Sequence, residues 1–247
     1  MVGILYFSST GNSLYIAQRI SKVADGKIIY IPEYDGKGEE FDKIIIVSPV
    51  YSFGLPCDVY NLLPRLSKDK PIHIVLNYGG MVGGADYFTY CYAKENGLNL
   101  QSVHIVKMPE NYTLTFTVPS FYVKSTLKSA PKKIDKIAQS IQNNEVVIPK
   151  KKKTKTDEYI KNKGNWHLIA DDFSVTESCV LCKKCIDVCP SGNISIKDNK
   201  ITFADKCVAC LGCYHRCPQK AIIYKGRNKK DRYINPNINE SDIGKNL

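Results

Sequence analysis

Near-continuous runs of isoleucine, valine and leucine recur through the first half of the chain, and stretches with helical periodicity separate them. Apolar runs of this kind are typical of strands buried on both faces, as in a parallel sheet that helices cover. They predict strands at residues 2–8, 27–31, 42–51, 71–80 and 102–109. Apolar residues at helical spacing predict helices at residues 13–23, 57–66, 85–97 and 132–144.

The alternation of strands and crossover helices predicts an α/β domain with a doubly wound, five-stranded parallel sheet over residues 1–145. Its length and element order fit the flavodoxin-like strand order 2-1-3-4-5. The cysteine-rich residues 172–226 predict a second, small α+β domain. A connector at residues 146–171 precedes it, and a polar tail at residues 227–247 follows it.

The connector and the tail are mostly polar. The charge run PKKKKTK at residues 149–155 is typical of a solvated linker. The rest of the connector can add a helix and a strand, with Trp166 as a packing anchor. In the tail, Tyr233 and Ile234 either dock on a neighbouring surface or fray with the segment, and the sequence leaves both options open.

Composition narrows the class of protein. The chain has 247 residues, of which 43% are hydrophobic, which suffices for a packed core. No apolar run approaches the roughly 20 residues that span a bilayer, so we expect no membrane contact. The first residues lack the basic flank of a signal peptide, so we expect a cytoplasmic protein. A reducing cytoplasm argues against structural disulfides among the ten cysteines.

The formal net charge of +11 suggests two kinds of binding partner, a nucleic acid and an acidic redox protein. The basic residues are scattered outside the run at residues 149–155, and no nucleic-acid reader motif is present. We therefore expect redox partner proteins, with acidic ones as an option, and no nucleic acid.

Eight of the ten cysteines occur in two copies of one pattern. The runs CVLCKKCIDVCP and CVACLGCYHRCP begin at Cys179 and Cys207, with two, two and three residues between successive cysteines. Three cysteines at every third residue wrap a loop around a cube, so that their thiolates reach three irons of one [4Fe–4S] cluster. Structural zinc usually takes two separated cysteine pairs, which would leave the third cysteine without a role. We interpret His215 as a helix-surface residue, and Cys57 and Cys91 as packed thiols.

These runs resemble the bacterial dicluster ferredoxins over about residues 172–225. In such ferredoxins the fourth cysteine of each run ligates the other cluster, and this implies two sets of four ligands. The first cluster takes Cys179, Cys182, Cys185 and Cys217, and the second takes Cys207, Cys210, Cys213 and Cys189.

Three loops at the carboxyl ends of predicted strands suggest a site for FMN. The hydroxyls and N–H groups of SSTGNS can wrap a phosphate at a helix N-terminus, although an ordinary N-cap explains that loop equally well by itself. The aromatic residues of SPVYSFGLP offer a wall for a flat ring, and the glycines of NYGGMVGGAD let the backbone approach it closely. The candidate FMN residues are Ser8, Ser9, Thr10, Gly11, Asn12, Ser13, Pro49, Val50, Tyr51, Ser52, Phe53, Gly54, Asn77, Tyr78, Gly79, Gly80, Gly83 and Gly84.

The loops SSTGNS and SPVYSFGLP resemble those of flavodoxins. The whole chain resembles the EFR1-family ferredoxins, in which a flavodoxin-like domain is fused to a dicluster ferredoxin domain. The segments MPENY at residues 108–112 and RYINP at residues 232–236 also resemble that family. The resemblance implies FMN, two [4Fe–4S] clusters and electron transfer between two-electron and one-electron carriers.

Electron transfer of this kind requires no catalytic acid, base or nucleophile. The alternative is a flavin-dependent reductase of a quinone or nitro compound, with the clusters as its electron supply. It needs an open apolar pocket, for which Tyr51, Phe53, Tyr78 and Tyr87 are candidates. The sequence also leaves open a homodimer, in which a cluster of one chain exchanges electrons with the flavin of the partner chain.

Overall fold

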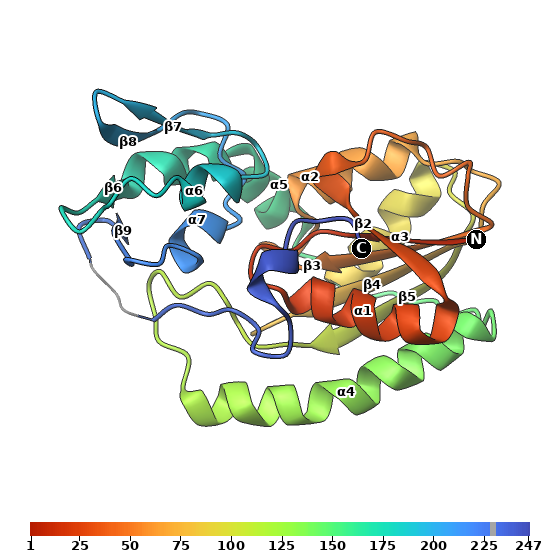
Figure 1. The fold of residues 1–247 in the computed structure, drawn as a ribbon. Coiled ribbons are helices and arrows are strands. Elements are labelled where there is room, and N and C mark those ends of the chain that lie inside the picture. Colours follow the sequence, from red (N-terminus) through yellow and green to blue (C-terminus); the bar gives the residue numbers. More distant parts are fainter. Residues whose placement is uncertain (228–230) are drawn as a thin grey trace.

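The computed structural model of the chain describes residues 1–227 and 231–247 and contains a five-stranded parallel sheet with strand order β2-β1-β3-β4-β5 (Figure 1). The predicted fold class and strand order are confirmed, and each strand end lies within two residues of its prediction. The apolar runs of the sequence follow from burial, because Ile44, Ile45, Ile46 and Val47 are all completely buried. The strands are β1 (Val2–Tyr6), β2 (Gly26–Tyr30), β3 (Lys43–Pro49), β4 (Ile72–Tyr78) and β5 (Leu100–Lys107).

Helices cover both faces of the sheet (Figure 1). On one face, α1 (Asn12–Ala24) and α4 (Ser120–Gln142) pack side by side. On the other face lie α2 (Cys57–Leu62) and α3 (Ala85–Glu95). The 3₁₀ turns η1 (Ile31–Glu33) and η2 (Leu63–Arg65) follow β2 and α2. No helix in the described residues is long and apolar enough to cross a membrane.

The last helix of this domain is longer than the predicted residues 132–144. It begins at Ser120 and runs through Pro131, although proline usually interrupts a helix interior. Its buried stripe starts with Thr126 and Ala130, and these residues are too small or too polar to reveal a helix by their pattern. The sequence prediction therefore missed the first half of α4.

The cysteine-rich residues form a small α+β module beside the sheet domain (Figure 1). A second apolar cluster, which includes Phe173, Tyr214 and Ile222, forms its core. The predicted architecture of this part is confirmed. Its elements are the antiparallel pairs β6 (Phe173–Val175) with β9 (Ile222–Tyr224) and β7 (Ile194–Lys197) with β8 (Lys200–Phe203), and the short helices α6 (Lys184–Asp187) and α7 (Gly212–His215).

The connector folds against the sheet domain. It contains α5 (Thr156–Gly164) and the 3₁₀ helix η3 (Trp166–Asp172). The ring centroid of Trp166 lies 6.0 Å from that of Tyr51 and 6.1 Å from that of the fully buried Tyr159. Trp166 therefore packs as the sequence predicts, and it joins the connector to the loop after β3.

The C-terminal tail docks on the sheet domain and does not fray. Leu247 exchanges two main-chain hydrogen bonds with Ile28 of the edge strand β2, at 3.0 and 2.8 Å. The hydroxyl of Tyr6 in β1 accepts two main-chain N–H groups of the tail at 3.0 and 3.1 Å. The tail also contains the 3₁₀ turn η4 (Glu240–Asp242), whereas its residues 228–230 lie outside the described residues.

Candidate functional site

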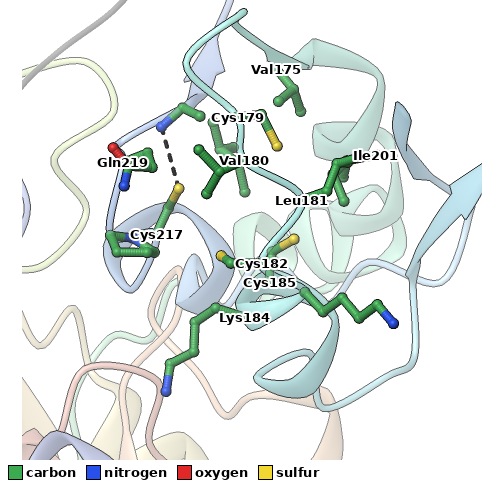
Figure 2. A pocket seen from close by; sticks show the side chains of 14 residues that line it. Val175, Cys179, Val180, Leu181, Cys182, Lys184, Cys185, Ile201, Cys217 and Gln219 are labelled. Carbon is green, nitrogen blue, oxygen red and sulfur yellow. Dashed lines mark hydrogen bonds between the residues drawn. The ribbon is translucent and has the colours of Figure 1, made fainter. Parts of the chain in front are cut away.

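The eight cysteines of the repeated runs lie around two cavities, four at each. The structure thus brings together the same two sets that the sequence predicts, while their role as ligands stays a prediction. Figure 2 shows the first set, whose sulfur atoms surround a cavity with mostly apolar walls. The first cavity is lined by Cys179, Cys182, Cys185 and Cys217, and the second by Cys189, Cys207, Cys210 and Cys213.

The two cysteine loops share an unusual backbone conformation. Leu181 and Lys183 in the first run have φ angles of 52° and 64°, and the equivalent Ala209 and Leu211 have φ angles of 55° and 61°. Each left-handed non-glycine residue costs roughly 1 to 2 kcal/mol. Its repetition at equivalent positions indicates that both loops are shaped for the same kind of enclosed group.

The last cysteine of each run also has a matched environment. The N–H of Asn193 donates to Sγ of Cys189 at 3.3 Å, and the N–H of Ala221 donates to Sγ of Cys217 at 3.3 Å. In both cases the donor lies four residues after the cysteine. Hydrogen bonds to sulfur stabilise a thiolate and tune the reduction potential of an iron–sulfur cluster.

The donor set fits clusters rather than free thiols. Burial raises the pKa of the Cys185 thiol to about 11, and burial also raises the pKa of Cys210 and Cys213. A buried thiolate needs a positive partner, which iron supplies. Within the described residues no group of three His, Cys, Asp or Glu side chains is arranged to hold a single metal ion. A cluster differs from such an ion because each of its four irons takes one cysteine.

A third cavity, of about 560 Å³, lies at the carboxyl ends of β3, β4 and β5. The connector and the second cysteine run complete its walls. Its volume is typical of small-molecule sites, which measure roughly 300 to 1,000 Å³. Seven of the predicted FMN residues line it, namely Val50, Tyr51, Ser52, Phe53, Tyr78, Gly79 and Gly80.

The loop after β3 forms a tight turn at this cavity. The main chains of Tyr51 and Gly54 exchange two hydrogen bonds of 3.0 Å. Between them, Ser52 and Phe53 have φ angles of 46° and 73°. Two successive non-glycine residues in the left-handed region store strain, and such strain is concentrated at ligand sites.

The sequence analysis missed the loop after β5 as part of the site. Glu110, Asn111 and Tyr112 all line the cavity. The Glu110 carboxylate accepts the N–H of Gly80 at 3.0 Å, which ties this loop to the loop after β4. Their position directly after the fifth strand could have identified them, because the ligand edge of such a sheet includes that strand end.

Several predicted FMN residues do not line the cavity: Pro49, Gly54, Asn77, Gly83 and Gly84. The side chain of Asn77 is buried and donates to Oγ of Ser13 at 2.8 Å and to the Ser48 carbonyl at 3.1 Å. The Gly83 carbonyl accepts the N–H of Lys155 in the connector at 3.3 Å. Tyr87 is also absent from the cavity wall.

The loop before α1 is buried and presents hydrogen-bond donors. The hydroxyl oxygens of Ser8, Thr10 and Ser13 each accept a hydrogen bond of 2.8 to 3.0 Å from a neighbouring N–H group. Within the described residues none of these hydroxyls donates to a protein acceptor, so each keeps an unused donor. Ser9 Oγ is buried beside Tyr51 without a partner in hydrogen-bond geometry. This donor set at a helix N-terminus fits a phosphate, although the loop does not itself line the cavity.

His215 is buried, so the prediction of a helix-surface residue is wrong. The sequence could not show that the tail and the loop after β5 cover this side of α7. His215 Nδ1 accepts the N–H of Tyr233 at 3.1 Å, and a main-chain N–H can only donate. Nε2 therefore carries the proton and donates to the Asn111 carbonyl at 2.7 Å. Burial lowers the pKa of His215 to about 4, which agrees with a neutral ring.

Cys210 and Leu211 line both the large cavity and the second cysteine cavity. These two residues form the wall between them. The strand-end cavity of the sheet domain thus shares a wall with a cysteine-lined cavity of the second module.

Two family models match the chain, the flavodoxin domain at residues 3–81 and the 4Fe-4S dicluster domain at residues 145–222. The chain is therefore a flavodoxin domain fused to a 4Fe-4S dicluster domain, and the dicluster domain implies two [4Fe–4S] clusters. These two domains are associated with electron transfer.

Three solved structures are similar to part of this chain. The Fusobacterium nucleatum flavodoxin bound to flavin mononucleotide is 15% identical and has a TM-score of 0.43, over 58% of this chain and 98% of that chain. The two-electron reduced Megasphaera elsdenii flavodoxin is 20% identical and has a TM-score of 0.37, over 53% and 99%. The flavodiiron core of Flv1 from Synechocystis is 18% identical and has a TM-score of 0.39, over 58% of this chain but only 36% of that chain. No curated protein matches the chain.

Proposed function

We propose that the chain is an electron-transfer protein that binds FMN and two [4Fe–4S] clusters and converts between two-electron and one-electron carriers. When bound, FMN exchanges one or two electrons and each cluster exchanges one. The observation that carries the proposal is the wall of Cys210 and Leu211 between the large cavity and the second cysteine cavity.

The residues of the sheet domain divide the binding of FMN between them. The hydroxyls of the loop before α1 would hold its phosphate. Tyr51 and Phe53 would flank the flat ring, and the backbone of Gly79 and Gly80 allows close approach to its edge. Trp166 on the connector would exclude water from this side of the cavity.

The cysteine sets differ in their access to solvent. Cys210 in the second set is buried against the large cavity, whereas Cys182 in the first set is exposed and Val180 beside it is 63% exposed. This arrangement supports electron transfer from the large cavity to the second cysteine set, and from there to the first cysteine set and the surface. A single chain contains this order, so the proposal does not require a homodimer.

We also propose that one-electron partners dock at this exposed end, where Lys183 and Lys184 favour an acidic surface. The compartment that fits is the cytoplasm, because cysteines that ligate clusters must stay reduced and thiols persist in a reducing environment.

Anaerobic purification tests the composition, which should be one FMN and about eight iron atoms per chain. The duplicated runs offer a matched pair of variants for the electron path, because Cys179 and Cys207 hold equivalent positions. After flash reduction of the flavin, Cys207→Ala should abolish fast reoxidation of the flavin. Cys179→Ala should keep that step and lose the reduction of an external one-electron acceptor. Equal behaviour of the two variants would contradict the proposed order.

A flavin-dependent reductase of a small acceptor is the second candidate. The observation in its favour is the apolar rim of the large cavity, where Met81, Tyr112 and Phe116 are all exposed. Steady-state turnover of a quinone or a nitro compound tests it. A turnover that survives in Cys207→Ala, with a chemical reductant for the flavin, would favour the reductase over the carrier.

A further inference from the structure

We propose that His215 is a positioning residue for the phosphate side of the FMN site, acting through Asn111 and Tyr233. The inference rests on the FMN site proposed above. It links the helix that carries cluster cysteines to the loop that would hold the flavin phosphate.

On one side, His215 reaches the loop through Asn111. The Nε2–H group of His215 donates to the Asn111 carbonyl at 2.7 Å. The side chain of Asn111 donates in turn to Oγ1 of Thr10 at 2.9 Å. Since Thr10 Oγ1 then already accepts a hydrogen bond, its own proton is directed elsewhere, as a phosphate acceptor requires.

On the other side, His215 reaches the loop through the tail. The N–H of Tyr233 donates to His215 Nδ1 at 3.1 Å, and the Tyr233 hydroxyl donates to Oδ1 of Asn12 at 2.7 Å. Asn235, which is completely buried, donates its side-chain N–H to the same oxygen at 3.1 Å. Its main-chain N–H donates to the Thr10 carbonyl at 2.8 Å.

These contacts have a common effect on the charge distribution of the loop. Donors from the tail bind two oxygen atoms that would repel a phosphate. These are Oδ1 of Asn12 and the carbonyl oxygen of Thr10. Within residues 1–227 and 231–247 the hydroxyls of Ser8, Thr10 and Ser13 donate to no protein acceptor, whereas the Gly11 N–H already donates to Ser8 Oγ. A pre-organised donor set binds an anion better than a mobile one, because less ordering is required on binding.

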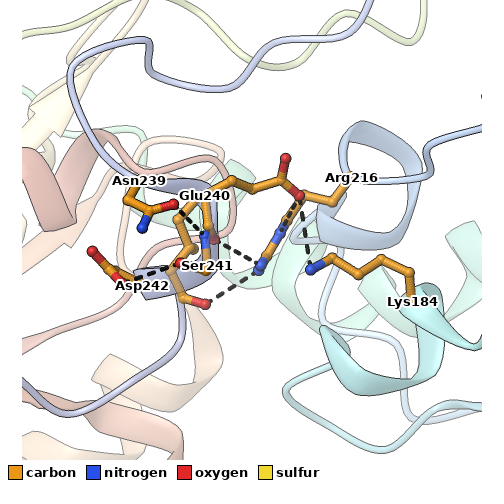
Figure 3. A network of polar contacts seen from close by, with 7 residues as sticks. Lys184, Arg216, Asn239, Glu240, Ser241 and Asp242 are labelled. Atoms are coloured by element: carbon orange, nitrogen blue, oxygen red, sulfur yellow. Dashed lines mark hydrogen bonds and ion pairs between the residues drawn. The ribbon is translucent and has the colours of Figure 1, made fainter.

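The position of His215 depends on the clusters. It lies between Cys213, which lines the second cavity, and Cys217, which lines the first. The next residue, Arg216, donates to the main-chain carbonyl of Glu240 at 3.0 Å and so holds the tail at the C-terminal end of α7 (Figure 3). Ligation of both cysteines would fix α7 and with it the contacts to Asn111 and Tyr233.

The test compares FMN with riboflavin, which has the same ring and no phosphate. Their dissociation constants are measured by flavin fluorescence for the wild type, Tyr233→Phe, His215→Ala and the control His167→Ala, whose side chain is exposed on η3. Tyr233→Phe should weaken FMN by about two- to tenfold, because one hydrogen bond to the loop is lost. His215→Ala should weaken FMN by about tenfold or more, and His167→Ala should change nothing. Riboflavin should bind equally to all four proteins.

A purely structural role of His215 would weaken riboflavin and FMN alike, and this outcome overturns the inference. Wild-type FMN affinity in both Tyr233→Phe and His215→Ala overturns it as well. If His215→Ala loses iron, the FMN and riboflavin affinities of Tyr233→Phe decide between the two roles. The Tyr233 hydroxyl contacts the loop and no cysteine, so this variant should keep its iron. A wild type that binds no FMN contradicts the proposed function instead.

Discussion

Arg216 and Glu240 join the cluster module to the C-terminal tail (Figure 3). The guanidinium of Arg216 donates to the Glu240 carbonyl at 3.0 Å and lies 3.4 Å from its carboxylate. The Arg216 side chain is only 6% exposed, whereas the Glu240 side chain is 41% exposed, so the arginine end of this contact is shielded from water. Lys184 lies 3.9 Å from the same carboxylate but is 36% exposed. The Glu240 carboxylate therefore has two basic partners, of which Arg216 is buried and Lys184 is solvated.

Arg216→Ala should reduce the free energy of unfolding by about 2 to 4 kcal/mol, because it removes a buried charge that hydrogen-bonds two tail carbonyls. Lys184→Ala is the matched control and should cost less than about 1 kcal/mol, because water screens exposed pairs. Anaerobic denaturant titration of the cluster-loaded proteins measures both. Similar losses in the two variants would show that the tail is not held mainly by Arg216.

Thr10→Val should weaken FMN by about tenfold or more, because a hydrogen bond to a charged acceptor contributes roughly 1.5 to 3 kcal/mol. The iron content should stay at the wild-type value. Thr89→Val provides a control, since Thr89 is also buried but lies in α3 away from the loop. Equal FMN affinity in the wild type and Thr10→Val would remove the loop before α1 from the phosphate site.

The fold was largely predictable because its strongest determinants are local. Ile44 to Val47 form a run of β-branched residues without polar residues, which is typical of a strand buried on both faces. The duplicated cysteine spacing is equally local and identified the first three cysteines of each set, whereas the exchange of the fourth cysteine came from the resemblance to dicluster ferredoxins. By contrast, the first half of α4 buries only Thr126 and Ala130 while Phe121 is exposed, so its apolar residues did not mark the buried face of a helix.

The site was predictable only where it is built from single loops. Tyr51 and Phe53 were found because they follow a recognisable strand. The role of Asn111 was missed, since its partners Thr10 and His215 are about one hundred residues away on either side. Contacts of that sequence separation arise from the packing of two domains, and no local pattern encodes them.

The stability of the sheet should depend on pH through His73. This side chain is completely buried between neighbouring strands, with Nδ1 at 2.7 Å from Oγ of Ser102. Burial, followed by the charges of Lys43 and His104, lowers the pKa of His73 to about 4. Below the ordinary histidine pKa of about 6.5, His73 binds a proton in the unfolded chain but stays neutral in the folded chain. Stability is therefore complete above pH 6.5 and falls as the pH drops toward 4.

Denaturant titrations at pH 7 and pH 5 measure this effect, which amounts to at most about 1.4 kcal/mol for each pH unit below 6.5. The variant His73→Asn cannot titrate and should lose part of the difference between the two pH values. The comparison cancels the contribution of the clusters, which both proteins contain. An unchanged pH dependence in His73→Asn would exclude His73 as its source.

Removal of the clusters should weaken FMN binding more than riboflavin binding. Without iron, Cys213 and Cys217 no longer fix α7, so His215 holds Asn111 and Tyr233 less firmly. The affinity for FMN should fall by about fivefold, at the lower end of typical coupling between sites, while the affinity for riboflavin stays constant. Fluorescence titrations before and after anaerobic iron chelation provide the measurement, with circular dichroism to verify that the sheet domain remains folded. In Tyr233→Phe the branch of this link that runs through the tail is already broken, so chelation should have a smaller effect on FMN there. An equal loss of FMN affinity in the wild type and Tyr233→Phe would mean that the clusters do not act on the flavin site through the Tyr233 hydroxyl.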